Sequence, residues 1–167
     1  MAHNALRAHG RAVQMLRAYA KQPIEVGFAP TCGMCYPESE KPEDIEAARQ
    51  MMFSMSLQPA DNWTWNVAWW SDPVLLGHYP EEGLRLYEPY LPKITDEDMK
   101  LIHEPLDIYG QNIYNGRCFR MGPDGRPQEV ARPLGAPKTA VDWPVTPECI
   151  YWGLKYLDER YHMPMYL

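Results

Sequence analysis

The alternation of apolar and polar positions divides the first third of the chain into a helix, a strand and a second helix. Residues 3–21 are rich in Ala, Leu and Arg, with apolar positions near one helical face. Pro23 ends that helix, and residues 24–28, which read IEVGF, predict a short strand. A loop rich in Pro, Cys and Gly follows. Pro42 then suits the first position of a helix whose apolar residues recur at helical spacing.

The last third of the chain repeats this order. Thr95 and Asp98 resemble a capping box ahead of a short helix that runs to His103. Residues 107–112 predict a buried strand, and residues 116–140 predict a loop with a hairpin around Pro-Asp-Gly. Thr146 and Pro147 are expected to cap a final helix, followed by a strand from residue 163. The apolar stripe of that helix is predicted to consist of Ile150, Leu154, Leu157 and Tyr161.

The middle of the chain has a weaker pattern. Residues 57–79 contain four tryptophans and show no clean period, which predicts a long aromatic loop. Pro80 is expected to open a short helix that extends to Leu91. The whole chain therefore alternates helix and strand, and such alternation predicts an α/β fold with a parallel sheet. A length of 167 residues fits one domain with a real core.

Composition and charge exclude several classes of function. The formal net charge is −6, and no basic stripe is present, which argues against nucleic acid as a partner. No apolar run approaches the roughly 20 residues that cross a membrane. The first residues lack a hydrophobic signal core, so we expect a cytoplasmic protein. No strand is followed by a glycine-rich nucleotide fingerprint, and we expect no cofactor.

The pair Cys32 and Cys35 follows the first predicted strand with the spacing C-x-x-C. This arrangement is typical of thiol oxidoreductases when a helix begins at the second cysteine. Here the helical pattern begins only at Pro42, so two thiols in a loop are the favoured interpretation. The other two cysteines, Cys118 and Cys149, stand alone, and no histidine pair has ligand spacing, so no metal site is predicted.

Tryptophans and carboxylates are the residues that carbohydrate chemistry would use. The flat faces of sugars pack on indole rings, and Trp63, Trp65, Trp69 and Trp70 are clustered, with Trp143 further on. Simple packing of the segment is the favoured interpretation for most of these indoles. Hydrolysis of a glycosidic bond needs two facing carboxyl groups.

Of the acidic residues, only Glu38, Glu104 and Asp107 lie near predicted strand ends. Glu104 and Asp107 precede their strand, whereas chemistry in a parallel barrel collects at the carboxyl ends of strands. The sequence His103-Glu104-Pro105 therefore only imitates a catalytic Asn-Glu-Pro.

Several motifs together resemble family 1 glycoside hydrolases, the retaining β-glucosidases. The segment DIYGQNIYN at 107–115 resembles the D-F-x-G-x-N-Y-Y-T strand of those enzymes. The likeness extends, in order, through essentially the whole chain. It includes HNALRAH at 3–9, WSDP at 70–73 with GHYP at 77–80, LP at 91–92 before TDE at 95–97, and DW at 142–143 before PE at 147–148.

The resemblance implies a partial (β/α)₈ TIM barrel. Residues 1–167 would form a single partial-barrel domain comprising about the fifth to seventh β/α units, without the first four and the last strand units. The family's acid/base glutamate would then lie before Met1, and its nucleophile just after Leu167. The resemblance thus implies that no catalytic residue lies in this chain.

The same resemblance assigns supporting roles to three residues. Tyr114 matches the tyrosine that orients the nucleophile, Asn112 matches a substrate-binding asparagine, and Trp143 matches the tryptophan under the aglycone. The chain departs from the family at Ile113, which replaces a tyrosine, and at Asp142, which replaces a glycine.

The sequence therefore predicts a fragment of a β-glucosidase acting on β-linked glucosides or galactosides, inactive by itself. One alternative is a non-catalytic, sugar-binding half-barrel that self-associates or pairs through exposed sheet edges. A second alternative is a C-x-x-C thiol oxidoreductase, which requires reactive thiols of low pKa.

Overall fold

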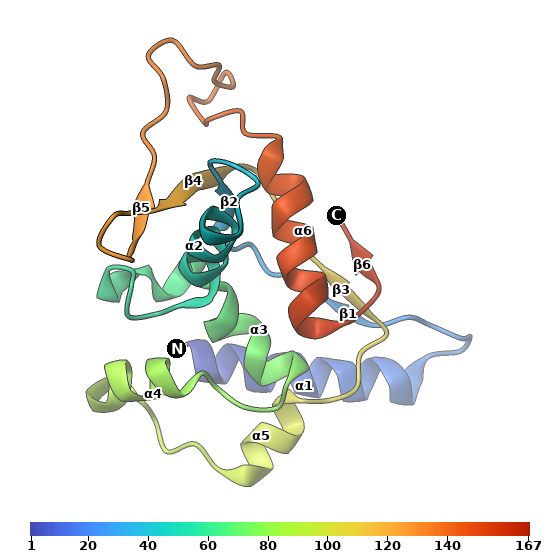
Figure 1. Ribbon diagram of the computed structural model, residues 1–167. Coiled ribbons are helices and arrows are strands. Elements are labelled where there is room, and N and C mark those ends of the chain that lie inside the picture. The colour runs from blue at the N-terminus through green and yellow to red at the C-terminus, as the bar shows by residue number, and fades with distance from the viewer.

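The computed structural model describes residues 1–59 and 61–167 and contains two small sheets with helices packed beside them (Figure 1). The helices are α1 (Ala2–Tyr19), α2 (Pro42–Phe53), η1 (Ala60–Trp65), α3 (Val67–Leu75), α4 (Glu81–Tyr87), η2 (Glu88–Tyr90), α5 (Asp96–Ile102) and α6 (Glu148–Tyr161). The strands are β1 (Gly27–Phe28), β2 (Met34–Pro37), β3 (Ile108–Gly110), β4 (Gly116–Met121), β5 (Pro127–Glu129) and β6 (Met165–Tyr166). None of these helices has the length and apolar character that a membrane crossing requires.

Helix α1 packs on α5 through a close backbone approach. Leu6 and Val13 are buried on this side, whereas Leu16, predicted near the same face, is 53% exposed. A Cβ atom on Gly10 would lie 1.9 Å from the carbonyl oxygen of Leu101, so a side chain at this position would force the two helices apart. The glycine therefore sets the distance between α1 and α5.

The predicted parallel sheet is present, in the order β1-β3-β6. Gly27 pairs with Ile108, and Tyr109 pairs with Met165, so strands far apart in sequence lie side by side. All three strands point the same way, and β3 is central, with Tyr109 fully buried. Within the described residues the outer edges of β1 and β6 carry no partner strand.

A second sheet, β2-β4-β5, was not predicted as such. Strand β2 pairs in parallel with β4, and β4 forms an antiparallel hairpin with β5. The predicted hairpin is confirmed, since the amide of Gly122 donates to the carbonyl of Arg126 across the turn. The expectation of a loop at 29–41 and over most of 116–140 was wrong at β2, β4 and β5. Short mixed strands such as MCYP offer no alternation to detect.

The long aromatic loop predicted over residues 57–79 is instead largely helical, since it contains η1 and α3. Asn66 caps α3, because its side-chain oxygen accepts the amide of Trp69 at 2.9 Å. Seven of the nine residues of α3 are buried, so the helix has no polar face and therefore no 3.6-residue period. The burial of most of its residues hid this helix from pattern analysis.

The predicted caps have different outcomes at α5 and α6. Thr95 and Asp98 form the expected capping box, with reciprocal bonds between side chains and backbone. Thr146 does not cap α6 with its side chain; its hydroxyl accepts the amide of Gly116 at 2.8 Å and so ties the helix start to β4. Ile150 is 42% exposed, which corrects the predicted stripe. The buried residues of α6 are Cys149, Gly153, Tyr156, Leu157 and Tyr161.

Both thiols of the C-x-x-C motif lie in the core, not in an exposed loop. Cys32 is 6% exposed, and Cys35, which lies within β2, is 2% exposed. Burial raises the pKa of each thiol to about 12. Redox chemistry needs an accessible thiolate, so the structure contradicts the oxidoreductase interpretation.

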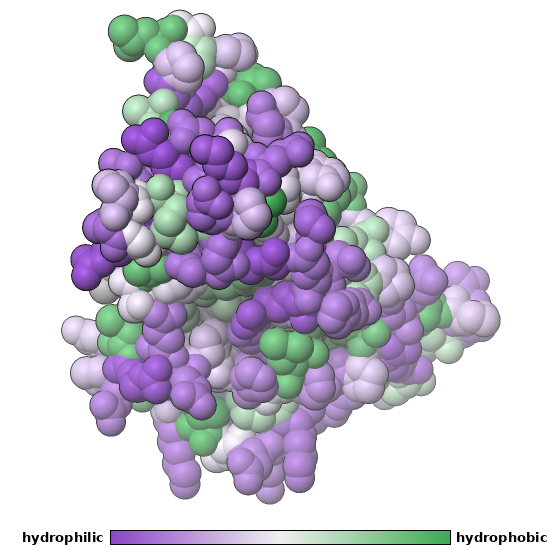
Figure 2. Space-filling model, in the orientation of Figure 1, coloured by the Kyte–Doolittle hydropathy of each residue, from purple (hydrophilic) through white to green (hydrophobic). Residues whose placement is uncertain are grey.

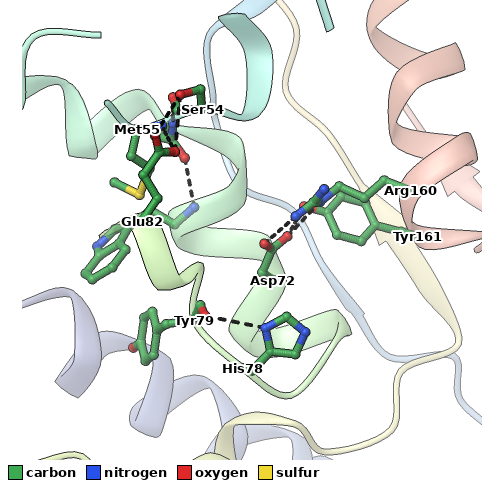
Figure 3. Close-up of polar contacts among 10 residues, drawn as sticks. Ser54, Met55, Asp72, His78, Tyr79, Glu82, Arg160 and Tyr161 are labelled. Atoms are coloured by element: carbon green, nitrogen blue, oxygen red, sulfur yellow. Dashed lines mark hydrogen bonds and ion pairs between the residues drawn. The ribbon is translucent and has the colours of Figure 1, made fainter. Parts of the chain in front are cut away.

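A buried ion pair ties α3 to the end of α6 (Figure 3). The carboxylate of Asp72 is fully buried and accepts from Arg160 Nε at 2.9 Å and Nη2 at 2.6 Å. The hydroxyl of Tyr161 donates to the same carboxylate at 2.8 Å. Because β6 begins four residues after Tyr161, this contact also fixes where the third parallel strand enters the sheet.

Replacing Asp72 by Asn should lower the free energy of unfolding by about 3 kcal/mol, because Arg160 would lose the charge that compensates its desolvation. Urea unfolding followed by circular dichroism measures the change. The matched control is Glu81→Gln, which breaks an exposed pair with Arg85 and should change stability by less than about 0.5 kcal/mol. Equal losses in the two variants would contradict this account.

Candidate carbohydrate-binding cleft

The candidate site lies where the parallel strands β1 and β3 end. Tyr109 in β3 donates its hydroxyl to Gln111 Oε1 at 2.9 Å, and Gln111 Nε2 donates to the carbonyl of Pro30 at 3.0 Å. The hydroxyls of Ser71 and Tyr109 lie 2.7 Å apart. A chain of largely buried hydrogen bonds thus connects α3, the end of β3 and the segment after β1.

Asn112 hydrogen-bonds to backbone carbonyls at this end of the sheet. Its backbone N–H donates to the carbonyl of Pro30 at 3.1 Å, and its side-chain amide donates to the carbonyl of Ala29 at 3.2 Å. These bonds hold the segment after β1 against the segment after β3. The residue is exposed, but it does not line the cleft described below.

Tyr114 and Trp143 lie together, as two walls of one cleft. Their ring centroids are 5.2 Å apart with planes tilted by 51°. Tyr114 is 58% exposed and Trp143 is 46% exposed, so each ring still presents surface to solvent. The structure thereby brings together two residues that are 29 positions apart and leaves both partly exposed.

Trp143 is held by a small loop of its own. Its amide donates to Thr139 Oγ1 at 3.1 Å, and its carbonyl accepts the amide of Thr139 at 2.8 Å. Asp142 has φ of 65°, the left-handed conformation that glycine adopts most readily. Lys138 pairs with Asp142 at 2.9 Å. This backbone conformation is one that glycine adopts easily, which fits the glycine expected at position 142 from the family resemblance.

The cleft has a volume of about 510 Å³, which is within the range of small-molecule sites. Amides and aromatic rings dominate its walls. Its lining consists of Thr31, Cys32, Gly33, Met34, Gln58, Asn62, Trp65, Tyr114, Asn115, Gly116, Arg117 and Trp143. Among these residues there is no carboxylate, and Arg117 is the one charged side chain.

Gln58, Asn62 and Arg117 were not predicted as site residues. Gln58 lies just before η1, Asn62 lies within η1, and Arg117 lies in β4 of the second sheet. Only tertiary structure brings them to the cleft. The density of amides and indoles in residues 58–66 was the one available signal.

The other tryptophans divide between core and surface. Trp69 is 5% exposed and packs against Tyr79 and Tyr87, with ring centroids 4.8 Å and 5.2 Å away. Trp70 donates its indole N–H to the carbonyl of Thr64 at 3.0 Å. Trp65, by contrast, is 53% exposed and lines the cleft, so it is the one member of the predicted aromatic cluster that joins Trp143 there.

The three carboxylates near strand ends have structural partners. Glu104 accepts from Gln14 Nε2 at 2.6 Å, before β3 begins. Asp107 accepts the amide of Val26 and an Arg17 guanidinium, and these contacts lower its pKa. Glu38 pairs with Arg120 at 3.5 Å. None of the three lines the cleft, which supports the interpretation of Glu104 as a bystander.

A second hollow, of about 420 Å³, lies beside the start of α1 and is mainly apolar. His3 and Tyr79 lie on its floor, with His3 Nδ1 3.0 Å from the Tyr79 hydroxyl. Among the described residues no group of three His, Cys, Asp or Glu side chains is placed to hold a metal ion.

Comparison with known proteins gives one consistent family. The model of glycosyl hydrolase family 1 matches residues 1–167. Beta-glucosidase A of Thermotoga maritima is 37% identical over 163 residues, which are 97% of this chain and 34% of that protein. The 1,4-beta-D-glucan glucohydrolase of Thermotoga neapolitana is 34% identical over 161 residues, 96% of this chain and 35% of that protein.

Solved structures agree. The beta-glucosidase from Thermotoga maritima in complex with glucoimidazole superposes with a TM-score of 0.70 at 38% identity, covering 99% of this chain and 35% of that one. A partial barrel fits this coverage, and the chain spans about a third of the length of the relatives it matches. Since the family model matches it from end to end, the chain belongs to glycosyl hydrolase family 1.

Proposed function

We propose that this chain is the aglycone-binding side of a retaining β-glucosidase that acts on β-linked glucosides or galactosides. Residues 1–167 would form one partial-barrel domain, equivalent to about the fifth to seventh β/α units. The observation that carries the proposal is the Tyr114–Trp143 pair, 5.2 Å apart, in a cleft beyond the carboxyl ends of parallel strands. In parallel barrels that end carries the chemistry.

Each predicted residue has a physical role in this proposal. The hydroxyl of Tyr114 would donate a hydrogen bond to the nucleophilic carboxylate, which favours the ionised form of that carboxylate. The indole of Trp143 would pack against the leaving group, and its half-exposed ring offers the surface to do so. Asn112, bonded to Ala29 and Pro30, would hold the strand ends that frame the sugar.

The cleft lacks the groups that break the glycosidic bond. A retaining enzyme needs one carboxyl group to protonate the leaving oxygen and a second, about 5–5.5 Å away, to attack the sugar. No Asp or Glu is among the lining residues of the described chain. Both carboxylates would have to come from barrel segments that these 167 residues do not include.

The purified chain should therefore hydrolyse a chromogenic β-glucoside no faster than buffer. The measurement is the release of nitrophenol over hours, with Beta-glucosidase A of Thermotoga maritima as the active control. Turnover well above buffer would contradict the proposal. If that turnover also disappeared in Glu104→Gln, Glu104 would be a catalytic residue and not a bystander.

A second candidate function is assembly of a non-catalytic half-barrel. Its support is the pair of open edges at β1 and β6, because unpaired strand edges are templates for further strands. The segment 130–147 adds exposed apolar side chains, including Leu134 and Val141. Figure 2 shows hydrophobic surface at the tip of this segment, above a face that is mostly hydrophilic.

On this second proposal the chain should self-associate, and its average mass in sedimentation equilibrium should rise above 19.4 kDa with concentration. Leu134→Ser separates the two surfaces, since it removes an apolar side chain from the loop and leaves the sheet edges intact. Association unchanged in this variant indicates pairing through the edges. A monomer at all concentrations would contradict the proposal.

A further inference from the structure

Arg117 is the one charged side chain among the residues that line the cleft, and it is a cation in a chain with a net charge of −6. It lies in β4 directly after Gly116, paired with Cys35 of β2. The chemistry proposed above uses no cation at this place. Arg117 therefore offers the one positive charge among the lining residues to a ligand in the cleft.

Two polar contacts of the Arg117 guanidinium are long. Its Nη1 lies 3.3 Å from Glu129 Oε2, and its Nη2 lies 3.5 Å from Gln58 Oε1. Tight contacts between ionised groups are about 2.7–2.9 Å long. The Arg117 side chain is 41% exposed and the Glu129 side chain is 52% exposed, so solvent screens this pair. An incoming carboxylate can replace these contacts at small cost.

The guanidinium also lies near an aromatic ring. Its carbon lies 5.2 Å from the centre of the Phe119 ring, and it spans the space between Gln58 in the cleft and Glu129 outside it. An arginine fork held by stacking presents parallel N–H donors that match the two oxygens of a carboxylate. The Nη2 side of that fork faces the cleft residue Gln58.

The remaining walls suit a flat aromatic group. Trp65 and Trp143 are 53% and 46% exposed, and the ring of Tyr114 lies beside Trp143. Three partly exposed aromatic rings in one cleft offer surface on which a flat aromatic ring can stack.

We propose that the leaving-group position of this cleft takes an aromatic ring bearing a carboxylate, with Arg117 pairing with that carboxylate. The substrate class would then be β-glucosides of aromatic hydroxy acids. This inference rests on the proposed function, because it assumes that the cleft holds the aglycone of a β-glucoside.

Phenyl β-glucoside and 4-carboxyphenyl β-glucoside, which differ only in the carboxylate, should bind the full chain with different affinity. Quenching of tryptophan fluorescence measures each Kd. The carboxylate should improve binding by about fivefold, as expected for a partly exposed charge-assisted contact. The advantage should shrink at high salt, because ions screen exposed pairs.

Variants on the same strand test the residue assignment. Arg117→Gln should abolish the preference for the carboxylate, and Arg117→Lys should keep part of it. Glu129→Gln should increase the preference, because it removes the competing carboxylate. Arg120→Gln is the matched control, since Arg120 lies on β4, pairs with Glu38 and does not line the cleft. It should leave the preference unchanged.

The outcomes separate this inference from the proposed function. Equal affinity for the two glucosides in the wild type and in Arg117→Gln overturns the role of Arg117 alone. Absence of binding by both overturns the assignment of the cleft itself. Equally tight binding of methyl glucuronide, which has the charge without the aromatic ring, overturns the aromatic part of the inference.

Discussion

The contact on which the structure depends is the buried carboxylate of Asp72 with Arg160 and Tyr161. Asp72 is fully buried, and a charge in that position is tolerable only when it is paired and hydrogen-bonded. Its neighbour Ser71 contacts the hydroxyl of Tyr109 at 2.7 Å. One turn of α3 therefore contacts both the central strand β3 and the end of α6 that leads into β6.

These contacts of α3 also reach the cleft. Tyr109 hydrogen-bonds to Gln111, and Gln111 hydrogen-bonds to the carbonyl of Pro30 in the segment after β1. The segments that lead to Tyr114 and to the Thr31–Met34 wall of the cleft therefore begin at residues that these hydrogen bonds tie to the sheet. A rigid scaffold that positions exposed residues is the arrangement on which binding sites depend.

Local signals were enough to predict several elements. Pro42 marks the start of α2, and Thr95 with Asp98 forms the predicted capping box. The alternation of helix and strand predicted a parallel sheet, and the structure contains one, in the order β1-β3-β6. Helix α3 escaped prediction because it is buried on nearly every side, which removes the polar face that reveals a helix. Strand β2 escaped because it is short and is defined only by its pairing with β4.

The site was predictable only in part, because some of its residues come together only in the folded structure. Resemblance to a family selected Asn112, Tyr114 and Trp143, and the structure brings the last two together. Gln58 and Arg117 belong to the same cleft but are 59 positions apart in the chain. No local pattern could join them.

The most direct test is to measure which indole NMR signals shift when a β-glucoside is added. In a ¹⁵N spectrum of the chain with phenyl β-glucoside, the indole signals of Trp65 and Trp143 should shift, because both rings line the cleft. The signals of Trp63 and Trp69, which line the other hollow, should stay in place. Shifts confined to Trp63 and Trp69 would contradict the account and would place the ligand beside α1.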